Sequence, residues 1–257
     1  MVKLLKRFVL SVLLLTSASS LANQKIVICM DQTWFPYTYV SSNSQIRGIH
    51  TDIIKMALNQ LRINYIIKPK PWKRCLVEAQ QGLVDAVATA SYKPQRAEFL
   101  LYPKDAGTKL RSNWRVMQVE WSLVTPVKEK YLYTGNLQTI PQPIYVPLGY
   151  SIGKTLVDEG LNVDSGSVTD ENNFRKITRT LKGSLVASTK VTEYYMNKLE
   201  LNGILIINKQ PIKTKSYFLV FSKKSAHKAV REAVWERIRI IREKYLQKLL
   251  LIELAVQ

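Results

Sequence analysis

Short, β-rich apolar runs alternate with segments of helical periodicity along most of the chain, and this alternation constrains the fold more than any other feature. The first part contains, in order, a strand at 25–30, a helix at 51–61, a strand at 63–67, a helix at 71–81 and a strand at 83–88. Strands that alternate with helices of this length predict right-handed βαβ units and a mostly parallel sheet with helices on its faces. The predicted fold class is therefore α/β.

A second α/β unit follows in the middle of the chain. Its strands and helices are expected at 144–146, 151–159, 170–182, 185–187, 189–199 and 204–207. Two extended passages, 114–124 and 216–221, flank this unit, and a long helix begins near Ser225. This order of elements predicts that the middle unit is inserted into the first.

The terminal helix has an apolar stripe whose members are three or four residues apart, with basic residues between them. The stripe consists of Val230, Val234, Ile238, Ile241, Tyr245 and Leu249. Such spacing is typical of an amphipathic helix docked on the first unit. A basic amphipathic helix lying on an anionic membrane surface is the alternative.

The first 22 residues have the pattern of a secretory signal peptide. Lys3, Lys6 and Arg7 precede an apolar run at 8–15, and small residues follow up to Ala22. This run is too short to span roughly 30 Å of hydrocarbon, which favours a cleaved leader over an uncleaved anchor helix. We therefore expect a mature protein that is soluble outside the cytoplasm.

The chain is strongly basic, with 38 Lys and Arg residues against 19 Asp and Glu residues and a formal net charge of +19. Net charge of this size bears on partners rather than on the fold. Non-specific binding of nucleic acid or anionic lipid, with its salt dependence, is one interpretation. We favour a basic, solvated surface and expect no nucleic-acid partner, because charge runs alone mark interaction only loosely.

Two cysteines, Cys29 and Cys75, fall in the first strand and in the second helix. An even pair in an oxidising compartment favours one disulfide over two free thiols. A structural disulfide between these residues is the prediction.

Most motifs that would indicate a metal, a cofactor or catalysis are missing. His50 and His227 lie far apart and belong to no spacing that completes a metal site, and no nucleophile-elbow pattern occurs. The segment GYSIGKT at 149–155 has three residues between its glycines where a phosphate-binding loop needs four. We expect neither metal nor cofactor. A glycine and a serine that open a helix still direct free N–H groups at an anion, so Ser151 is a candidate ligand contact.

Several motifs follow one another in a characteristic order. They are PWKRCL at 71–76, QGLVDAVATAS at 81–91, KPQR at 93–96 and FLLYP at 99–103, with support from WFPY at 34–37, GIHTD at 48–52, GYS at 149–151 and SYFLVFS at 216–222. Through them the chain resembles bacterial extracellular solute-binding proteins of family 3, the polar-amino-acid type that serve ABC importers. The resemblance extends over nearly all of the chain after the leader.

This resemblance implies a two-lobed periplasmic-binding-protein (Venus flytrap) fold, in which each lobe is a mostly parallel sheet flanked by helices. Lobe 1 would comprise residues 23–120 and 213–257. Lobe 2, inserted between them, would comprise residues 121–212. A small solute would bind in the cleft between the lobes.

The matching positions imply particular ligand contacts. Thr89, Ser91 and Arg96 stand where the family holds the ligand α-carboxylate, and a guanidinium offers a carboxylate a planar pair of donors. The aromatic loop would supply a stacking wall through Trp34 or Tyr37. Trp72 would be a further neighbour, and Ser151 would contact the ligand from lobe 2.

One departure from the family pattern follows Gly183. The family usually has an acidic residue in or just after the next strand, where it pairs with the ligand ammonium, whereas this chain reads SLVASTKV and has no acid before Glu193. This puts an α-amino-acid ligand in doubt. An organic anion, a modified amino acid and a peptide fragment remain open.

The leading functional hypothesis is a monomeric periplasmic solute-binding protein that captures a small polar or anionic, carboxylate-bearing solute without chemistry. It would close around the solute and present it to an ABC permease in the inner membrane. The first alternative is an enzyme on the same fold, because some proteins that resemble this family are periplasmic cyclohexadienyl dehydratases. Its general acid would be Asp31 or Glu193, the acids placed nearest the cleft. The second alternative is a solute sensor without a permease.

Overall fold

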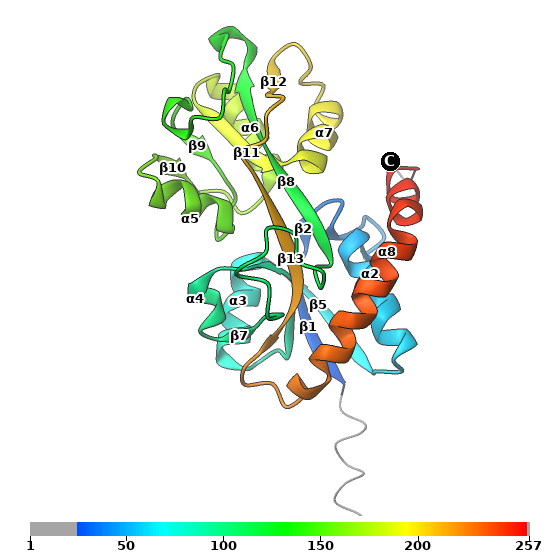
Figure 1. Ribbon diagram of the computed structural model, residues 1–257. Coiled ribbons are helices and arrows are strands. Elements are labelled where there is room, and N and C mark those ends of the chain that lie inside the picture. Colours follow the sequence, from blue (N-terminus) through cyan, green and yellow to red (C-terminus); the bar gives the residue numbers. More distant parts are fainter. Residues whose placement is uncertain (1–24, 256–257) are drawn as a thin grey trace, which may run out of the picture.

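The computed structural model describes residues 25–255, with side chains described for 25–244. The predicted leader lies outside the described residues, and so do the side chains of Tyr245 and Leu249. Two long strands, β8 (Met117–Pro126) and β13 (Lys213–Ser222), run antiparallel to each other and connect two lobes (Figure 1). The α/β fold class is confirmed.

The first lobe is built around β1 (Ile26–Asp31), which pairs in parallel with β5 (Tyr65–Lys70) and β6 (Ala86–Ser91). Residues of β1 are buried almost without a break, as expected for a parallel strand covered on both faces. The short strand β7 (Leu100–Leu101) pairs with β13. The helices of this lobe are α2 (Ile49–Gln60), α3 (Trp72–Gln81), α4 (Pro94–Ala97) and α8 (Arg231–Ala255).

Helix α8 lies against α2 in the first lobe (Figure 1). Val234, Ile238 and Ile241 of its apolar stripe are fully buried, and the indole nitrogen of Trp235 donates to the carbonyl oxygen of Leu219 at 2.6 Å. The described part of this helix is therefore docked on the protein, as predicted. Within residues 25–255, no helix is both long enough and apolar enough to cross a membrane.

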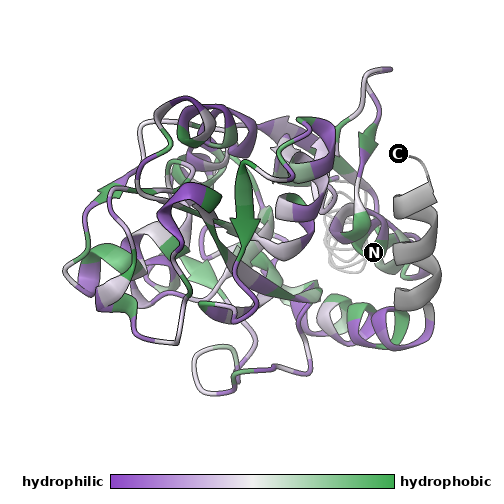
Figure 2. Ribbon diagram, turned by 90° about the horizontal axis from the view of Figure 1, so that it is seen from above, coloured by the Kyte–Doolittle hydropathy of each residue, from purple (hydrophilic) through white to green (hydrophobic). Residues whose placement is uncertain are grey.

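The second lobe repeats the layered plan on the other end of the sheet. Strand β9 (Ile144–Tyr145) pairs in parallel with β10 (Val163–Asp164) and β11 (Ser184–Ser188), while β11 and β12 (Leu205–Ile207) pair antiparallel with β8. Its helices are α5 (Ser151–Asp158), α6 (Asp170–Thr180) and α7 (Thr189–Lys198). The central strands are apolar and the outer helices carry polar faces (Figure 2). Single 3-10 turns occur at Val127–Glu129, Leu137–Thr139 and Lys228–Val230.

Three features differ from the expected elements. The loop after β1 contains a small sheet of β2 (Thr33–Trp34), β3 (Thr38–Val40) and β4 (Ile46–Arg47), whose strands are too short to show a period in the sequence. Strand β6 begins three residues later than expected, because the carboxylate of Asp85 accepts from the backbone of Val27 and closes a turn there. Helix α8 begins at Arg231 rather than near Ser225, whose hydroxyl donates to the same carboxylate.

Cys29 and Cys75 form a disulfide with a Cα–Cα distance of 5.3 Å. Both residues are fully buried, and the bond ties β1 to α3 beneath the edge of the sheet where the strands end. The boundaries of lobe 1 and lobe 2 at residues 120 and 213 stay a prediction, since β8 and β13 continue through both lobes.

Candidate ligand-binding cleft

The carboxyl ends of β1 and β6 and the first turn of α5 meet between the lobes. In an open α/β sheet, ligands bind at this edge because the strands end there and the following loops supply polar groups. A cavity of about 20 Å³ lies at this place in the closed structure. Its lining residues are Asp31, Trp34, Trp72, Thr89, Arg96, Tyr150, Ser151 and Tyr217.

Arg96 lies on one side of the cavity and is only 8% exposed. One guanidinium nitrogen, Nη1, donates to the carbonyl oxygen and the hydroxyl of Ser91 at 3.1 and 3.3 Å, and the other, Nη2, donates to the carbonyl of Gly149 at 3.1 Å. The hydroxyls of Ser91 and Ser151 are 2.7 Å apart. Arg96 thus connects the lobes through groups that a carboxylate would replace as acceptors.

Thr89 lines the cavity and is held from behind by His50. Its hydroxyl lies 2.7 Å from Nδ1 of His50, which is fully buried. Burial lowers the pKa of His50 to about 3, so the imidazole is neutral at physiological pH. Among the described residues no group of three or more His, Cys, Asp or Glu side chains is placed to hold a metal ion.

Aromatic rings form the walls. Trp34 packs against Tyr217 with ring centroids 5.0 Å apart and against Tyr150 at 6.0 Å. Tyr37 does not line the cavity but stacks behind Trp34 at 4.6 Å, and burial raises the pKa of its hydroxyl. Trp72 lines the opposite wall under the Arg96 guanidinium, which lies 5.3 Å from its ring centroid. Sequence reasoning missed Tyr150 and Tyr217, although both belong to motifs that carried the resemblance.

One buried carboxyl group, Asp31, lines the cavity, and a second, Asp170, does not line it but is close enough for the charge of Asp31 to act on it. Asp31, at the end of β1, is 3% exposed and accepts from the Tyr150 hydroxyl at 2.9 Å and from the Thr33 backbone at 3.0 Å. Burial raises the pKa of Asp31 to about 6, against the opposing effect of these hydrogen bonds. Asp170, the first residue of α6, is also 3% exposed. Burial, followed by the charge of Asp31, raises the pKa of Asp170 to about 8.

Glu193, the other acid expected near the cleft, does not line it. It lies on the exposed face of α7, where its carboxylate accepts from Lys190 at 2.7 Å. The inward positions of α7 are Val191, Thr192, Tyr195 and Met196. The acidic residue that comes near Asp31 from the second lobe is therefore Asp170, which precedes Gly183 instead of following it.

Two α/β lobes that are joined by paired crossing strands and close over a polar, aromatic cleft define a two-lobed solute-binding protein. The family model of bacterial extracellular solute-binding proteins, family 3, matches residues 26–243, and the chain belongs to this family. No curated protein sequence matches the chain.

Solved structures agree on the fold. An amino acid ABC transporter substrate-binding protein from Streptococcus pneumoniae, bound to L-arginine, is similar with a TM-score of 0.70 at 17% identity, over 93% of this chain and 97% of that chain. A histidine kinase sensor domain with similarity to periplasmic binding proteins has a TM-score of 0.72 at 13% identity, over 88% of this chain and 94% of that chain. An ancestral amino acid-binding protein, described as a precursor of cyclohexadienyl dehydratase, has a TM-score of 0.68 at 15% identity, over 91% of this chain and 97% of that chain.

Proposed function

We propose that this protein binds a zwitterionic, amino-acid-like solute in the cleft. One observation carries the proposal: a cationic side formed by Arg96 with the hydroxyls of Ser91 and Ser151 lies in the same cavity as the buried carboxyl group of Asp31. The solute carboxylate would accept hydrogen bonds from Arg96 and its ammonium would pair with Asp31. Charge-assisted hydrogen bonds of this kind contribute about 1.5–3 kcal/mol each.

These acids also stand in for the family's acidic residue that is missing after Gly183. A family member without an acid in that strand needs another partner for the ligand ammonium, and Asp31 of β1 supplies one, with Asp170 of α6 nearby. A bound ammonium would stabilise the ionised form of both carboxyl groups, whose pKa values burial raises. Trp34 and Tyr217 would flank the solute with ring faces.

Binding would require the lobes to separate. A cavity of about 20 Å³ holds about one water molecule and is far smaller than an amino acid. Opening would separate Tyr150 from Asp31 and Gly149 from Arg96, which frees the charged groups on both sides of the cleft. Closure onto the solute then follows from the extra affinity of the solute for the closed state.

We further propose that the leader at 1–22 directs the protein to the periplasm, where it acts as a monomer and delivers its solute to an ABC permease in the inner membrane. Membership of a family of bacterial extracellular solute-binding proteins supports this placement.

The test is a thermal-shift screen of the purified protein, unfolded and refolded to strip bound solute, against amino acids, organic anions and sugars. A solute at about 100 times its Kd should add roughly 2.7 kcal/mol to the free energy of unfolding. Stabilisation by compounds that carry both an ammonium and a carboxylate, recovered unchanged, is the expected result. Stabilisation only by sugars would contradict the proposal.

An enzyme is the second candidate, and one observation favours it. Asp31 and Asp170 are buried carboxyl groups with raised pKa values beside a cleft, an arrangement in which carboxylic acids serve as general acids. The same screen separates the candidates, since an enzyme would consume its stabilising compound during incubation, and prephenate-like acids belong in the panel for this reason. A sensor would bind its solute unchanged but would need no permease.

A further inference from the structure

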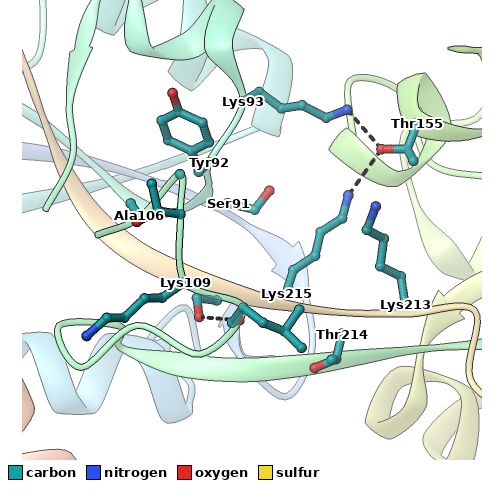
Figure 3. Close-up of a pocket in the computed structure, with 13 residues that line it drawn as sticks. Ser91, Tyr92, Lys93, Ala106, Lys109, Thr155, Lys213, Thr214 and Lys215 are labelled. Atoms are coloured by element: carbon teal, nitrogen blue, oxygen red, sulfur yellow. Dashed lines mark hydrogen bonds between the residues drawn. The ribbon is translucent and has the colours of Figure 1, made fainter. Parts of the chain in front are cut away.

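A second cavity, of about 410 Å³, lies beside the cleft. It is bounded by the end of β6, the loop at 106–110, the start of β13 and the first turns of α5 (Figure 3). Four lysines line it: Lys93 follows β6, Lys109 belongs to the loop, and Lys213 and Lys215 stand on β13. The side chain of Lys109 points away from the other three, which are the lysines considered below (Figure 3). Residues two apart on a strand point to the same face, so the side chains of Lys213 and Lys215 project together.

The lysine ammonium groups converge on hydroxyl groups of the second lobe. Nζ of Lys93 donates to Oγ1 of Thr155 at 2.8 Å, and Nζ of Lys215 donates to Oγ1 of Thr155 at 3.4 Å and to Oγ of Ser151 at 3.2 Å. Figure 3 shows the side chain of Lys213 running alongside that of Lys215. These acceptors are neutral, and an ammonium group has three donors, so the hydroxyls leave most of the donor capacity unused.

The only carboxylate whose charge acts on one of these lysines, among the described residues, is Asp158, which acts on Lys93 without forming a salt bridge to it. Within the part of the chain whose side chains are described, none of the three lysines forms a salt bridge. Asp158 on α5 accepts from Lys154 at 2.6 Å instead. Burial lowers the pKa of Lys215 to about 7, and the charges of Lys93, Lys213 and Arg96 act in the same direction. Gathering like charges in a partly buried cavity is unfavourable unless an anion joins them.

We propose that this cavity is a second binding site that takes a multiply charged oxyanion such as a phosphate group, held by Lys93, Lys213 and Lys215 with the Thr155 hydroxyl. The site adjoins the cleft, with Ser91 and Ser151 between the two, but its lysines do not line the cleft, and it stands whether or not the solute proposed above is correct. Since its lysines and its hydroxyl come from opposite sides of the closed interface, the anion would bind the closed arrangement better and favour it.

Titration calorimetry with inorganic phosphate at pH 7 and constant ionic strength tests this site. The double variant K213Q/K215Q should bind phosphate at least tenfold more weakly than the unchanged protein, because about 1.4 kcal/mol corresponds to a tenfold change and each lost charge-assisted bond exceeds it. The matched control is K128Q/K130Q, which removes the same charge from exposed lysines at the far end of the second lobe. This control should bind phosphate as the unchanged protein does.

Two results would overturn the proposal. One is no phosphate binding by the unchanged protein at millimolar concentration, and the other is equal weakening in both double variants, which would reduce the effect to net charge. Circular dichroism checks that each variant is folded. The variant R96A separates this site from the cleft, because it should lose carboxylate solutes and keep phosphate.

A further titration, with O-phosphoserine, shows whether the phosphate group is a free ion or part of a larger solute. If the group belongs to a solute that also enters the cleft, O-phosphoserine should bind more tightly than inorganic phosphate, and R96A should weaken O-phosphoserine alone. If the site takes a free phosphate ion, inorganic phosphate should bind at least as tightly as O-phosphoserine, both to the unchanged protein and to R96A. In either case K213Q/K215Q should abolish binding of whichever compound binds more tightly to the unchanged protein. This loss supports the site, and its absence contradicts it.

Discussion

The two lobes contribute to the cleft in different ways. The first lobe supplies most of the charge and the aromatic wall from strand ends and the residues that follow them, namely Asp31, Trp34, Thr89 and Arg96. The second lobe contributes from the starts of two helices, through Tyr150, Ser151 and Asp170. We infer that the first lobe determines which charged groups a solute must carry, while the second lobe closes over it and adjusts the electrostatics.

Replacing Arg96 by Ala should have the largest effect on solute binding. It removes the guanidinium that would hold the carboxylate, so affinity for the carboxylate solutes found by the thermal-shift screen should fall by a hundredfold or more, about 3 kcal/mol. Calorimetry measures this loss. Arg179→Ala, which changes an exposed arginine on α6, is the control. Affinity close to that of the unchanged protein in R96A would show that the first lobe holds the solute elsewhere.

The disulfide should make the first lobe the more sensitive to reduction. Its 46-residue separation predicts a stabilisation of about 4 kcal/mol from loop closure. The double variant C29S/C75S should therefore melt at lower temperature, and amide exchange should increase mainly in β1 and α3. Equal loss of protection in β9 and β11 would show that the lobes unfold as one unit.

Asp170 makes the second lobe sensitive to pH. The folded-state pKa values of Asp31 and Asp170, about 6 and about 8, lie above the ordinary value of 3.8. The folded protein therefore binds more protons than the unfolded chain between pH 4 and 8, and stability should fall as pH rises through this range. Asp170→Asn should flatten the decline and add on the order of 2–4 kcal/mol at pH 8.

Thermal melts between pH 4 and 9 measure this slope. Asp158→Asn is the control, because Lys154 holds the pKa of that exposed carboxyl below its ordinary value, so its loss should not flatten the decline. An unchanged slope in Asp170→Asn would assign the pH dependence to the first lobe alone.

Tyr150→Phe tests how much the second lobe contributes to keeping the lobes closed. The change removes the hydrogen bond to Asp31 and leaves the ring in place, so the closed state should lose about 1 kcal/mol relative to the open one. Small-angle X-ray scattering of the protein without solute should show a larger radius of gyration in the variant. The same radius as in the unchanged protein would show that this bond does not hold the lobes together.

Trp34→Phe should produce the smallest effect, since an aromatic ring remains against Tyr217. We expect affinity to fall by less than about 1 kcal/mol. The quenching of tryptophan fluorescence by solute should nevertheless be much reduced. Full quenching in the variant would make Trp72 the ring that reports on the cleft.

The sequence is informative about the first lobe for a physical reason. Parallel strands show as continuous apolar runs, and the residues at their ends must meet at one edge, which makes the positions of Thr89 and Ser91 predictable. The second lobe is harder: a glycine and a serine at the start of α5 indicate Ser151, but no local pattern shows that the start of α6 also approaches the cleft. Asp170 looks in the sequence like an ordinary acid in the first turn of a helix, where the helix dipole favours a negative charge.

The lysine cavity cannot be recognised from a local sequence pattern either. Lys213 and Lys215 alternate along a strand as solvent-facing residues do, and only the tertiary structure brings Ser151 and Thr155 of α5 within hydrogen-bond distance of Lys215. The expected elements are otherwise found, and the largest differences are at turns. There side-chain acceptors such as Asp85, which binds both Val27 and Ser225, decide where a strand or a helix begins.

The paired crossing strands set how the molecule moves. Residues 213–217 of β13 are hydrogen-bonded to residues 117–121 of β8, so the connection between the lobes is a ribbon and not a pair of loose linkers. A ribbon of this kind twists more readily than it stretches, and it returns when released. Any rotation of one lobe against the other must therefore bend or twist both strands together, which couples the two connections into a single hinge.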